Sequence, residues 1–184
     1  MSDTTTHSFY MRNTTSTKRN SLAELNEAGD TDAVRTLLPL CSSERWAREV
    51  TADRPYEDLD ALLDASDRVF AGLTVADLDA ALAGHPRIGD RVSGDGAAAQ
   101  LSRSEQSAMQ SADEQVAAQI LQGNKDYEHR FDRVFLIRAA GRSPREILAE
   151  LQRRLGNDPA DEQDEVREQL RQITRLRLEG QFSQ

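Results

Sequence analysis

The sequence predicts an all-α protein, folded as a single-domain bundle of about eight or nine helices. Apolar residues recur three and four positions apart along most of the chain, which is the spacing of one helix face. Serine, threonine, aspartate and proline stand directly before several of these segments, where they favour helix starts. No alternating run typical of strands and no long internal repeat competes with this prediction.

Five helices are expected in the first half of the chain. Ser42 or Ser43 could cap the third, and Thr74 caps the fifth. Pro55 stands at the entrance of the fourth, because proline is tolerated in a first turn. In order, these helices carry Leu22 and Leu25; Val34 to Leu40; Trp46 and Val50; Tyr56 to Leu73; and Val75 to Leu82.

A long loop and a helix are expected next. Residues 84–100 contain four glycines and Pro86 and show no sustained period, so they are predicted to be irregular. The helical spacing returns from Ser102 to Leu121, and Gly123 is expected to end that helix.

The last three helices are expected between Asn124 and the C-terminus. The first of them should be the central helix, since its apolar stripe is the strongest in the protein, and Gly141 should terminate it. The other two should begin at Ser143-Pro144 and Asp158-Pro159. The stripe of the central helix consists of Tyr127, Phe131, Val134, Phe135 and Ile137.

The domain is expected to span residues 21–180. Residues 1–20 are rich in threonine and serine and poor in apolar residues, which predicts a flexible tail, and residues 181–184 are expected to form a short C-terminal tail. The chain shows no secretory signal and no apolar run near the roughly 20 residues that cross a bilayer. Cys41 is the only cysteine, which excludes an internal disulfide. A cytoplasmic protein without a membrane segment is therefore expected.

Charge and residue spacing narrow the functional classes. The net charge of −9 argues against a broad phosphate-binding surface, so no nucleic-acid partner is expected, although local basic clusters remain possible. Lys18 and Lys125 are the only candidates for a Schiff-base lysine. No histidine pair has the spacing of a metal site, and no glycine-rich fingerprint indicates a nucleotide. Neither a metal nor a cofactor is expected.

His85 is the strongest candidate for chemistry. It lies in a Gly-His-Pro sequence, where Pro86 fixes one backbone angle and the glycines allow a ligand to approach the backbone closely. The alternative is that His85 merely caps or leaves a helix. The other histidines are weaker candidates, because His7 falls in the expected tail and His129 falls on the solvated side of a helix.

Glu105 and Gln106 form a second candidate site, and Arg138 a third. The sequence from Ser102 to Glu105 fits a capping box, which favours a structural role for Glu105. The same helix start presents amides and a positive dipole end to an anionic ligand, so a binding role stays open. Gln106 could add an amide contact.

Eight short motifs follow one another along the chain: Leu25-Asn26, Cys41 to Ala47, Arg54-Pro55, Ala83 to Gly89, Ser102 to Gln106, Tyr127 to Phe131, Phe135 to Ser143 and Ile173 to Leu178. In their order and spacing they resemble the motifs of the 2-oxo-4-hydroxy-4-carboxy-5-ureidoimidazoline (OHCU) decarboxylase family. The resemblance covers roughly residues 22 to 179, and it is the order and spacing of the motifs that make it specific.

The resemblance implies an all-α carboxy-lyase, usually a homodimer, that acts in urate catabolism after urate oxidase and 5-hydroxyisourate hydrolase. It would convert OHCU to (S)-allantoin and carbon dioxide without a cofactor. Transferred onto this chain, the catalytic residues are His85 as acid/base and Glu105. The implied substrate-binding residues are Pro86, Ser102, Arg103, Ser104, Glu105, Gln106, Ile137, Arg138, Ala139, Ala140 and Gly141.

Two residues depart from the family pattern. Arg138 stands where a small or apolar residue is expected, so it either brings a charge to the substrate site or points elsewhere. Asp90 stands where a glutamate is common. Two other functions remain as alternatives: a hydrolase or isomerase acting on a related ureide with its carboxylate retained, and a non-catalytic helical interaction module.

Overall fold

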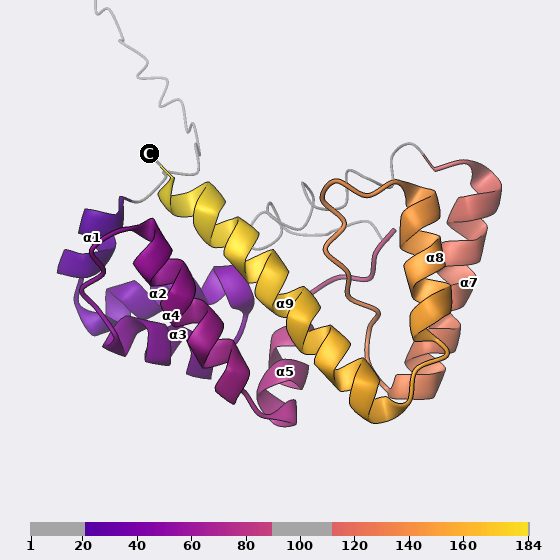
Figure 1. The fold of residues 1–184 in the computed structure, drawn as a ribbon, viewed down its shortest axis with the longest axis horizontal. Coiled ribbons are helices and arrows are strands. Elements are labelled where there is room, and N and C mark those ends of the chain that lie inside the picture. Colours follow the sequence, from indigo (N-terminus) through magenta and orange to yellow (C-terminus); the bar gives the residue numbers. More distant parts are fainter. Residues whose placement is uncertain (1–20, 90–111, 184) are drawn as a thin grey trace, which may run out of the picture.

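The computed structural model of the protein describes residues 21–89 and 112–183 (Figure 1). Those ranges contain eight α-helices and no strand, which confirms the predicted all-α class. None of these helices is long and apolar enough to cross a membrane. The helices are α1 (Leu22–Glu27), α2 (Asp30–Cys41), α3 (Glu44–Ala52), α4 (Leu59–Gly72), α5 (Val75–Leu82), α7 (Glu114–Phe131), α8 (Pro144–Arg154) and α9 (Pro159–Phe182).

Side-chain caps set most helix starts. Ser43, and not Ser42, caps α3, because Ser42 ends α2 in the left-handed conformation with φ 61°. Thr74 and Ser143 form capping boxes, each with the acidic residue three positions on. Asp158 caps α9 and Pro159 opens it, as predicted. The helix α9 continues to Phe182, two residues past the expected domain boundary at 180, and the Phe182 ring is buried.

The first core lies between helices α1 to α5 and α9. Trp46 is fully buried there, and its indole N–H donates to the Ser66 hydroxyl at 3.0 Å, so its polar atom is satisfied inside the apolar core. From α9, Arg167 donates to the carbonyl oxygens of Phe70 and Leu73 at the C-terminal end of α4. These bonds fix α4 against α9.

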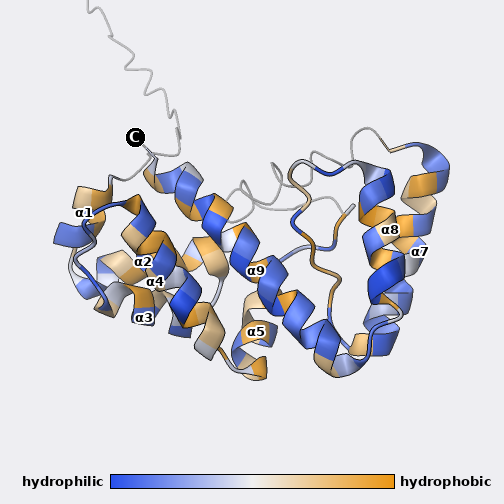
Figure 2. Ribbon diagram, in the orientation of Figure 1, coloured by the Kyte–Doolittle hydropathy of each residue, from blue (hydrophilic) through white to orange (hydrophobic). Residues whose placement is uncertain are grey.

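A second, smaller core joins α7, α8 and the segment between them. Its buried members include Ile120, Tyr127, Phe135 and Ile147. Figure 1 shows the α7–α8 pair on one side of the molecule and α1 to α4 on the other, with α9 running obliquely between them. In Figure 2 the visible face of α9 is mainly hydrophilic, as expected for a helix that packs its other face against the core.

The helix α7 differs from its prediction at both ends and in the middle. It begins at Glu114, with Asp113 as its cap, so residues 112 and 113 are not helical. It then runs unbroken through Gly123, which was wrongly expected to end a helix. A Cβ atom at Gly123 would lie 2.6 Å from Leu151 Cδ2, so this glycine lets α8 approach α7 closely.

The predicted central helix is also wrong beyond Phe131. Asp132 ends α7 in the left-handed conformation, and residues 133–143 contain no helix. Helices α8 and α9 satisfy backbone groups there: Arg154 donates to the Leu136 carbonyl at 2.7 Å, and Gln169 accepts from the Arg138 amide at 2.9 Å. An apolar run buried on both sides shows the same composition as a helix, which explains the error.

The helix α4 starts three residues later than predicted, at Leu59, with Asp58 as its cap. The backbone of Tyr56 is instead bound by the Asn26 side chain, which donates to the Tyr56 carbonyl and accepts from its amide. Tyr56 therefore belongs to the connection between α3 and α4, and Pro55 lies before the helix and not in its first turn.

Candidate functional site

His85 lies where the chain leaves α5. Its amide donates to the Leu82 carbonyl at 2.9 Å, and its Nδ1 lies 2.9 Å from the Ala81 carbonyl oxygen. Because a carbonyl oxygen can only accept, the hydrogen of the neutral ring sits on Nδ1. The other ring nitrogen, Nε2, is buried and has no hydrogen-bond partner among the residues that the structure describes, and His85 is only 7% exposed.

The surroundings of His85 keep its ring neutral. The pKa of His85 is lowered to about 4, mainly by burial and in addition by the positive charge of Arg177, while the bond to Ala81 acts in the opposite direction. At neutral pH the ring thus carries a free lone pair on Nε2. A neutral imidazole with one nitrogen held and the other free is the form that accepts a proton.

Arg177 is a site residue that the sequence reasoning did not single out. It lies on α9, is 3% exposed, and donates to the Leu40 carbonyl at 3.2 Å. A signal for it existed, because Arg177 follows Ile173 by four positions on the buried stripe of α9, where a charge is costly. A buried guanidinium beside His85 favours an anionic ligand at this place.

The ends of α2 and α5 meet beside His85. A Cβ atom at Gly84 would lie 2.5 Å from the Ser42 hydroxyl oxygen, so only glycine permits this approach. Cys41 is fully buried nearby and hydrogen-bonds to Thr174 of α9. Burial raises the pKa of the Cys41 thiol to about 12, so the thiol stays protonated and is a poor nucleophile.

The predicted binding segment from Ile137 to Gly141 packs on α9. Ile137 and Ala139 are buried, Ala140 is partly buried and Gly141 is exposed with φ +80°. Arg138 turns toward α9: its Nε donates to Gln172 at 3.1 Å, and its Nη1 donates back to the Ala140 carbonyl at 3.2 Å. Arg138 thus ties its own segment to the helix.

The helix α9 relates this segment to His85. Gln169, which holds the Arg138 amide, stands eight residues before Arg177, and positions four apart lie on one face of a helix. Within the described ranges no hydrogen bond or ion pair joins His85 to the segment from Ile137 to Gly141. Pro86 is half-buried next to His85. The expected residues Ser102, Arg103, Ser104, Glu105 and Gln106 lie outside the described residues.

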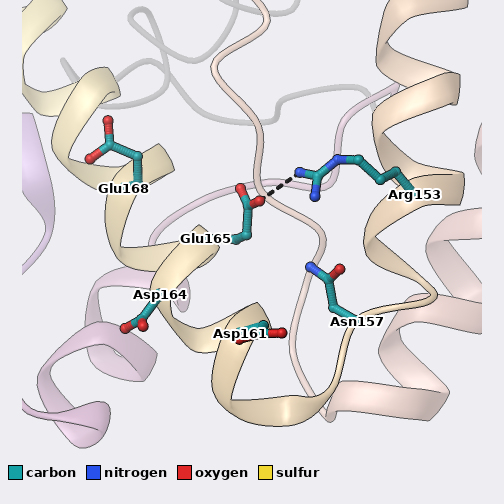
Figure 3. Close-up of a pocket in the computed structure, with 6 residues that line it drawn as sticks. All are labelled: Arg153, Asn157, Asp161, Asp164, Glu165 and Glu168. Atoms are coloured by element: carbon teal, nitrogen blue, oxygen red, sulfur yellow. Dashed lines mark hydrogen bonds and ion pairs between the residues drawn. The ribbon is translucent and has the colours of Figure 1, made fainter.

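A hollow lies away from these residues, between the end of α8 and the start of α9 (Figure 3). Arg153 reaches across it to Glu165, with 2.6 Å between nitrogen and oxygen. The excess of carboxylates there disfavours an anionic ligand. In the part of the chain that the structure describes, no group of three or more histidine, cysteine or acidic side chains is placed to hold a metal ion. The hollow is lined by Arg153, Asn157, Asp161, Asp164, Glu165 and Glu168.

Residues 26–179 match the model of a protein family described as OHCU decarboxylase. The chain is 30% identical over 146 residues to the uric acid degradation bifunctional protein TTL of Arabidopsis thaliana, a match that covers 78% of this chain and 45% of that protein. It is 32% identical over 135 residues to the 2-oxo-4-hydroxy-4-carboxy-5-ureidoimidazoline decarboxylase of Amia calva, which covers 72% of this chain and 77% of that one.

Two solved structures share the fold. The crystal structure of an OHCU decarboxylase in the presence of (S)-allantoin has a TM-score of 0.71 and 23% sequence identity, and the match covers 85% of this chain and all of that one. The crystal structure of an (S)-allantoin synthase has a TM-score of 0.67 and 16% identity, with 89% of this chain and 54% of that chain covered. The chain therefore spans about half the length of two of these four proteins.

Proposed function

Because the chain belongs to the OHCU decarboxylase family, we propose that it removes carbon dioxide from OHCU and releases (S)-allantoin in urate degradation. The observation that carries the proposal is the state of His85. Its neutral ring is fixed through Nδ1, Nε2 is buried with no partner in the described ranges, and the positive charge of Arg177 acts on the ring. That pair supplies a proton acceptor and a positive charge, which suits a substrate with a hydroxyl and a carboxylate.

The reaction breaks one carbon–carbon bond, moves one proton within the substrate and takes up one proton from solvent. The carboxylate leaves as carbon dioxide, and its bonding electron pair moves into the adjacent imine, whose nitrogen takes up the solvent proton. The substrate thus supplies its own electron sink. His85 Nε2 accepts the proton of the 4-hydroxyl as that carbon becomes a carbonyl, and His85 returns this proton to the neighbouring ring carbon. Return from one side only sets the (S) configuration.

Arg177 would hold the anionic substrate next to His85. Its guanidinium is buried, so its charge acts with little screening by solvent. A planar guanidinium also orients a carboxylate or a carbonyl oxygen through paired N–H donors. Arg177 therefore orients the substrate, and the reacting hydroxyl meets His85.

The remaining family positions complete the proposed site. Pro86 and the segment from Ile137 to Gly141 would line it, with Arg138 shaping the segment from behind. Glu105 would act as the second catalytic group, and Ser102, Arg103, Ser104 and Gln106 would bind the ureido and ring nitrogens. We further propose a cytoplasmic homodimer that needs no cofactor and works downstream of urate oxidase and 5-hydroxyisourate hydrolase.

The test is the decarboxylation of freshly generated OHCU. Urate, urate oxidase and 5-hydroxyisourate hydrolase supply the substrate, and carbon dioxide release is followed together with the circular dichroism of the allantoin formed. Rapid release of carbon dioxide with one enantiomer, against a slow racemic background, is the expected result. Conversion with the carboxylate retained would indicate a hydrolase or isomerase, and no conversion above background would indicate a non-catalytic module.

A further inference from the structure

The loop segment from His85 to Ile88 is anchored at both of its ends. At its start, His85 bonds to the last turn of α5 through its amide and its ring. Three residues later, the Ile88 carbonyl accepts a hydrogen bond of 3.0 Å from the side-chain amide of Asn124 on α7. Arg87, between them, makes a two-fold ion pair with Glu128, one turn further along α7. Hydrogen bonds and an ion pair therefore hold this segment against both α5 and α7.

The two bonds to α7 differ in their environment. Asn124 is 2% exposed and Ile88 is 7% exposed, so water has little access to the amide–carbonyl bond. Loss of this buried hydrogen bond is costly, because the Ile88 carbonyl would then have neither a donor nor water as a partner. The Arg87–Glu128 pair is partly exposed and contributes less. Asn124 is thus the stronger tether.

We propose that α7 positions His85 through these two contacts, with Asn124 as the principal positioning residue and Glu128 as a secondary one. Between His85 and Ile88, Pro86 has a fixed φ angle, which removes one of the rotations that could absorb a shift of Ile88. A shift of Ile88 consequently reaches the imidazole and turns Nε2 away from its direction. The kinetic consequence rests on the proposed decarboxylase function, whereas the structural consequence does not.

Asn124→Leu separates positioning from stability. Leucine has nearly the shape of asparagine and lacks the Nδ2 donor that holds Ile88. It also removes Asn124 Oδ1, a buried oxygen with no partner among the described residues, and it is a better helix former. These two gains offset part of the cost of the unpaired Ile88 carbonyl, so the variant should fold with a moderately lowered melting temperature while residues 85–88 lose their anchor on α7.

The direct test is the NMR signature of the imidazole nitrogens. In the wild type, His85 should show a protonated Nδ1 and an unprotonated Nε2. In Asn124→Leu the His85 signals should shift or broaden, whereas those of His129, which is exposed on the same helix, should stay unchanged. Unchanged His85 signals in a folded Asn124→Leu variant would overturn the proposal, whether or not the protein decarboxylates OHCU.

The kinetic test compares Asn124→Leu with Gln122→Leu. Gln122 is an exposed amide two residues earlier whose bond goes to Asp126, so it is a matched control on the same helix. Asn124→Leu should lower kcat about 10- to 100-fold with KM changed less than about three-fold, as expected for a misplaced base. Gln122→Leu should leave both constants unchanged.

Equal kcat for Asn124→Leu and wild type would contradict the proposal. Should Asn124→Leu fail to fold, Glu128→Gln decides: it should shift the His85 signals and lower kcat up to about five-fold, in keeping with a partly exposed ion pair. Identical His85 signals in Glu128→Gln and wild type would then refute the tether. An inactive wild type would refute the proposed function alone, and the NMR comparison would still decide the positioning role.

Discussion

At the scale of single residues, the protonation state of His85 is set by a hydrogen bond, a nearby charge and burial, which come from different places in the chain. Ala81 is four residues away, Arg177 lies on the last helix, and the burial of the ring depends on the packing of α5. The sequence identified His85 from its glycine and proline neighbours. Arg177 was missed although its charge falls on the buried stripe of α9, and Asn124 had no such signal, because only the folded chain brings it to Ile88.

The lowered pKa of His85 predicts a pH-dependent loss of stability. The pKa is about 4 in the folded chain and near 6.5 in the unfolded chain, so between these values only the unfolded chain binds the proton. The titration of His85 therefore leaves the free energy of unfolding unchanged above pH 6.5 and lowers it as the pH drops toward 4. From pH 7 to pH 5 the wild type should lose about 2 kcal/mol more than His85→Asn, measured by urea unfolding. Equal losses would show that His85 titrates normally.

Arg138 is predicted to act through its fork of hydrogen bonds and not through its charge. Its guanidinium contacts Gln172 and the Ala140 carbonyl. Arg138→Lys keeps the charge but loses this geometry, so it should resemble Arg138→Met. Each variant should lose about 1 kcal/mol of unfolding free energy, and the two variants should have similar KM values. If Arg138→Lys kept the wild-type KM while Arg138→Met raised it ten-fold or more, the charge itself would bind the substrate.

At the scale of elements, helix starts were easier to predict than helix ends. Ser143, Thr74 and Asp158 cap helices in the structure, because a cap is a local interaction within one turn. The end of α7 depends on distant partners: Arg154 and Gln169 bind the backbone that follows it. Gly123 was misread for the same reason, since its contact is with α8.

Two glycine substitutions are expected to change the stability of the protein in opposite directions, because only one of them lies where α7 and α8 approach closely. Gly180→Ala, at an exposed position of α9 with open space around it, should stabilise the protein by up to about 1 kcal/mol. Gly123→Ala should destabilise it by about 1 to 2 kcal/mol, because its new methyl group would meet the fully buried Leu151. Urea unfolding of both variants checks this. Stabilisation by Gly123→Ala would mean that the two helices have room to separate.

At the scale of the whole molecule, a buried polar network connects the second core to α9. Arg154 of α8 donates to Glu162 of α9 at 2.5 Å and to the Leu136 carbonyl, and Tyr127 of α7 also bonds to Glu162. Arg154 also lies over the Phe135 ring, 4.7 Å from its centre. Every element around the second core thus meets at one ion pair that water does not reach.

We expect a substitution of Arg154 to destabilise the protein strongly, and a second substitution at Glu162 to restore part of the lost stability. Arg154→Met leaves the carboxylate of Glu162 buried without its cation, which should cost about 3 to 5 kcal/mol of unfolding free energy. The double variant Arg154→Met/Glu162→Leu removes the stranded charge and should regain at least about 1 kcal/mol. Chemical unfolding of the two variants measures the difference. A double variant less stable than Arg154→Met would show that the other partners of Glu162 carry the network.

The arrangement of the whole molecule also explains the position of the site. The helix α9 runs between the two groups of helices (Figure 1). Gln169 of α9 accepts from the Arg138 amide, and the charge of Arg177, eight residues further along the same helix, acts on His85. The sequence predicted most of the helices but not this arrangement, in which α9 interacts with two segments that lie far apart in the chain.

The role of His85 is tested most directly by the rate of carbon dioxide release from OHCU in His85→Asn and in His129→Gln. Both variants lose one imidazole, but His129 is exposed on α7 and lies outside the proposed site. We expect kcat to fall at least about 100-fold in His85→Asn, as for loss of a general base, and to stay at the wild-type value in His129→Gln. Wild-type kcat in a folded His85→Asn variant would contradict this role.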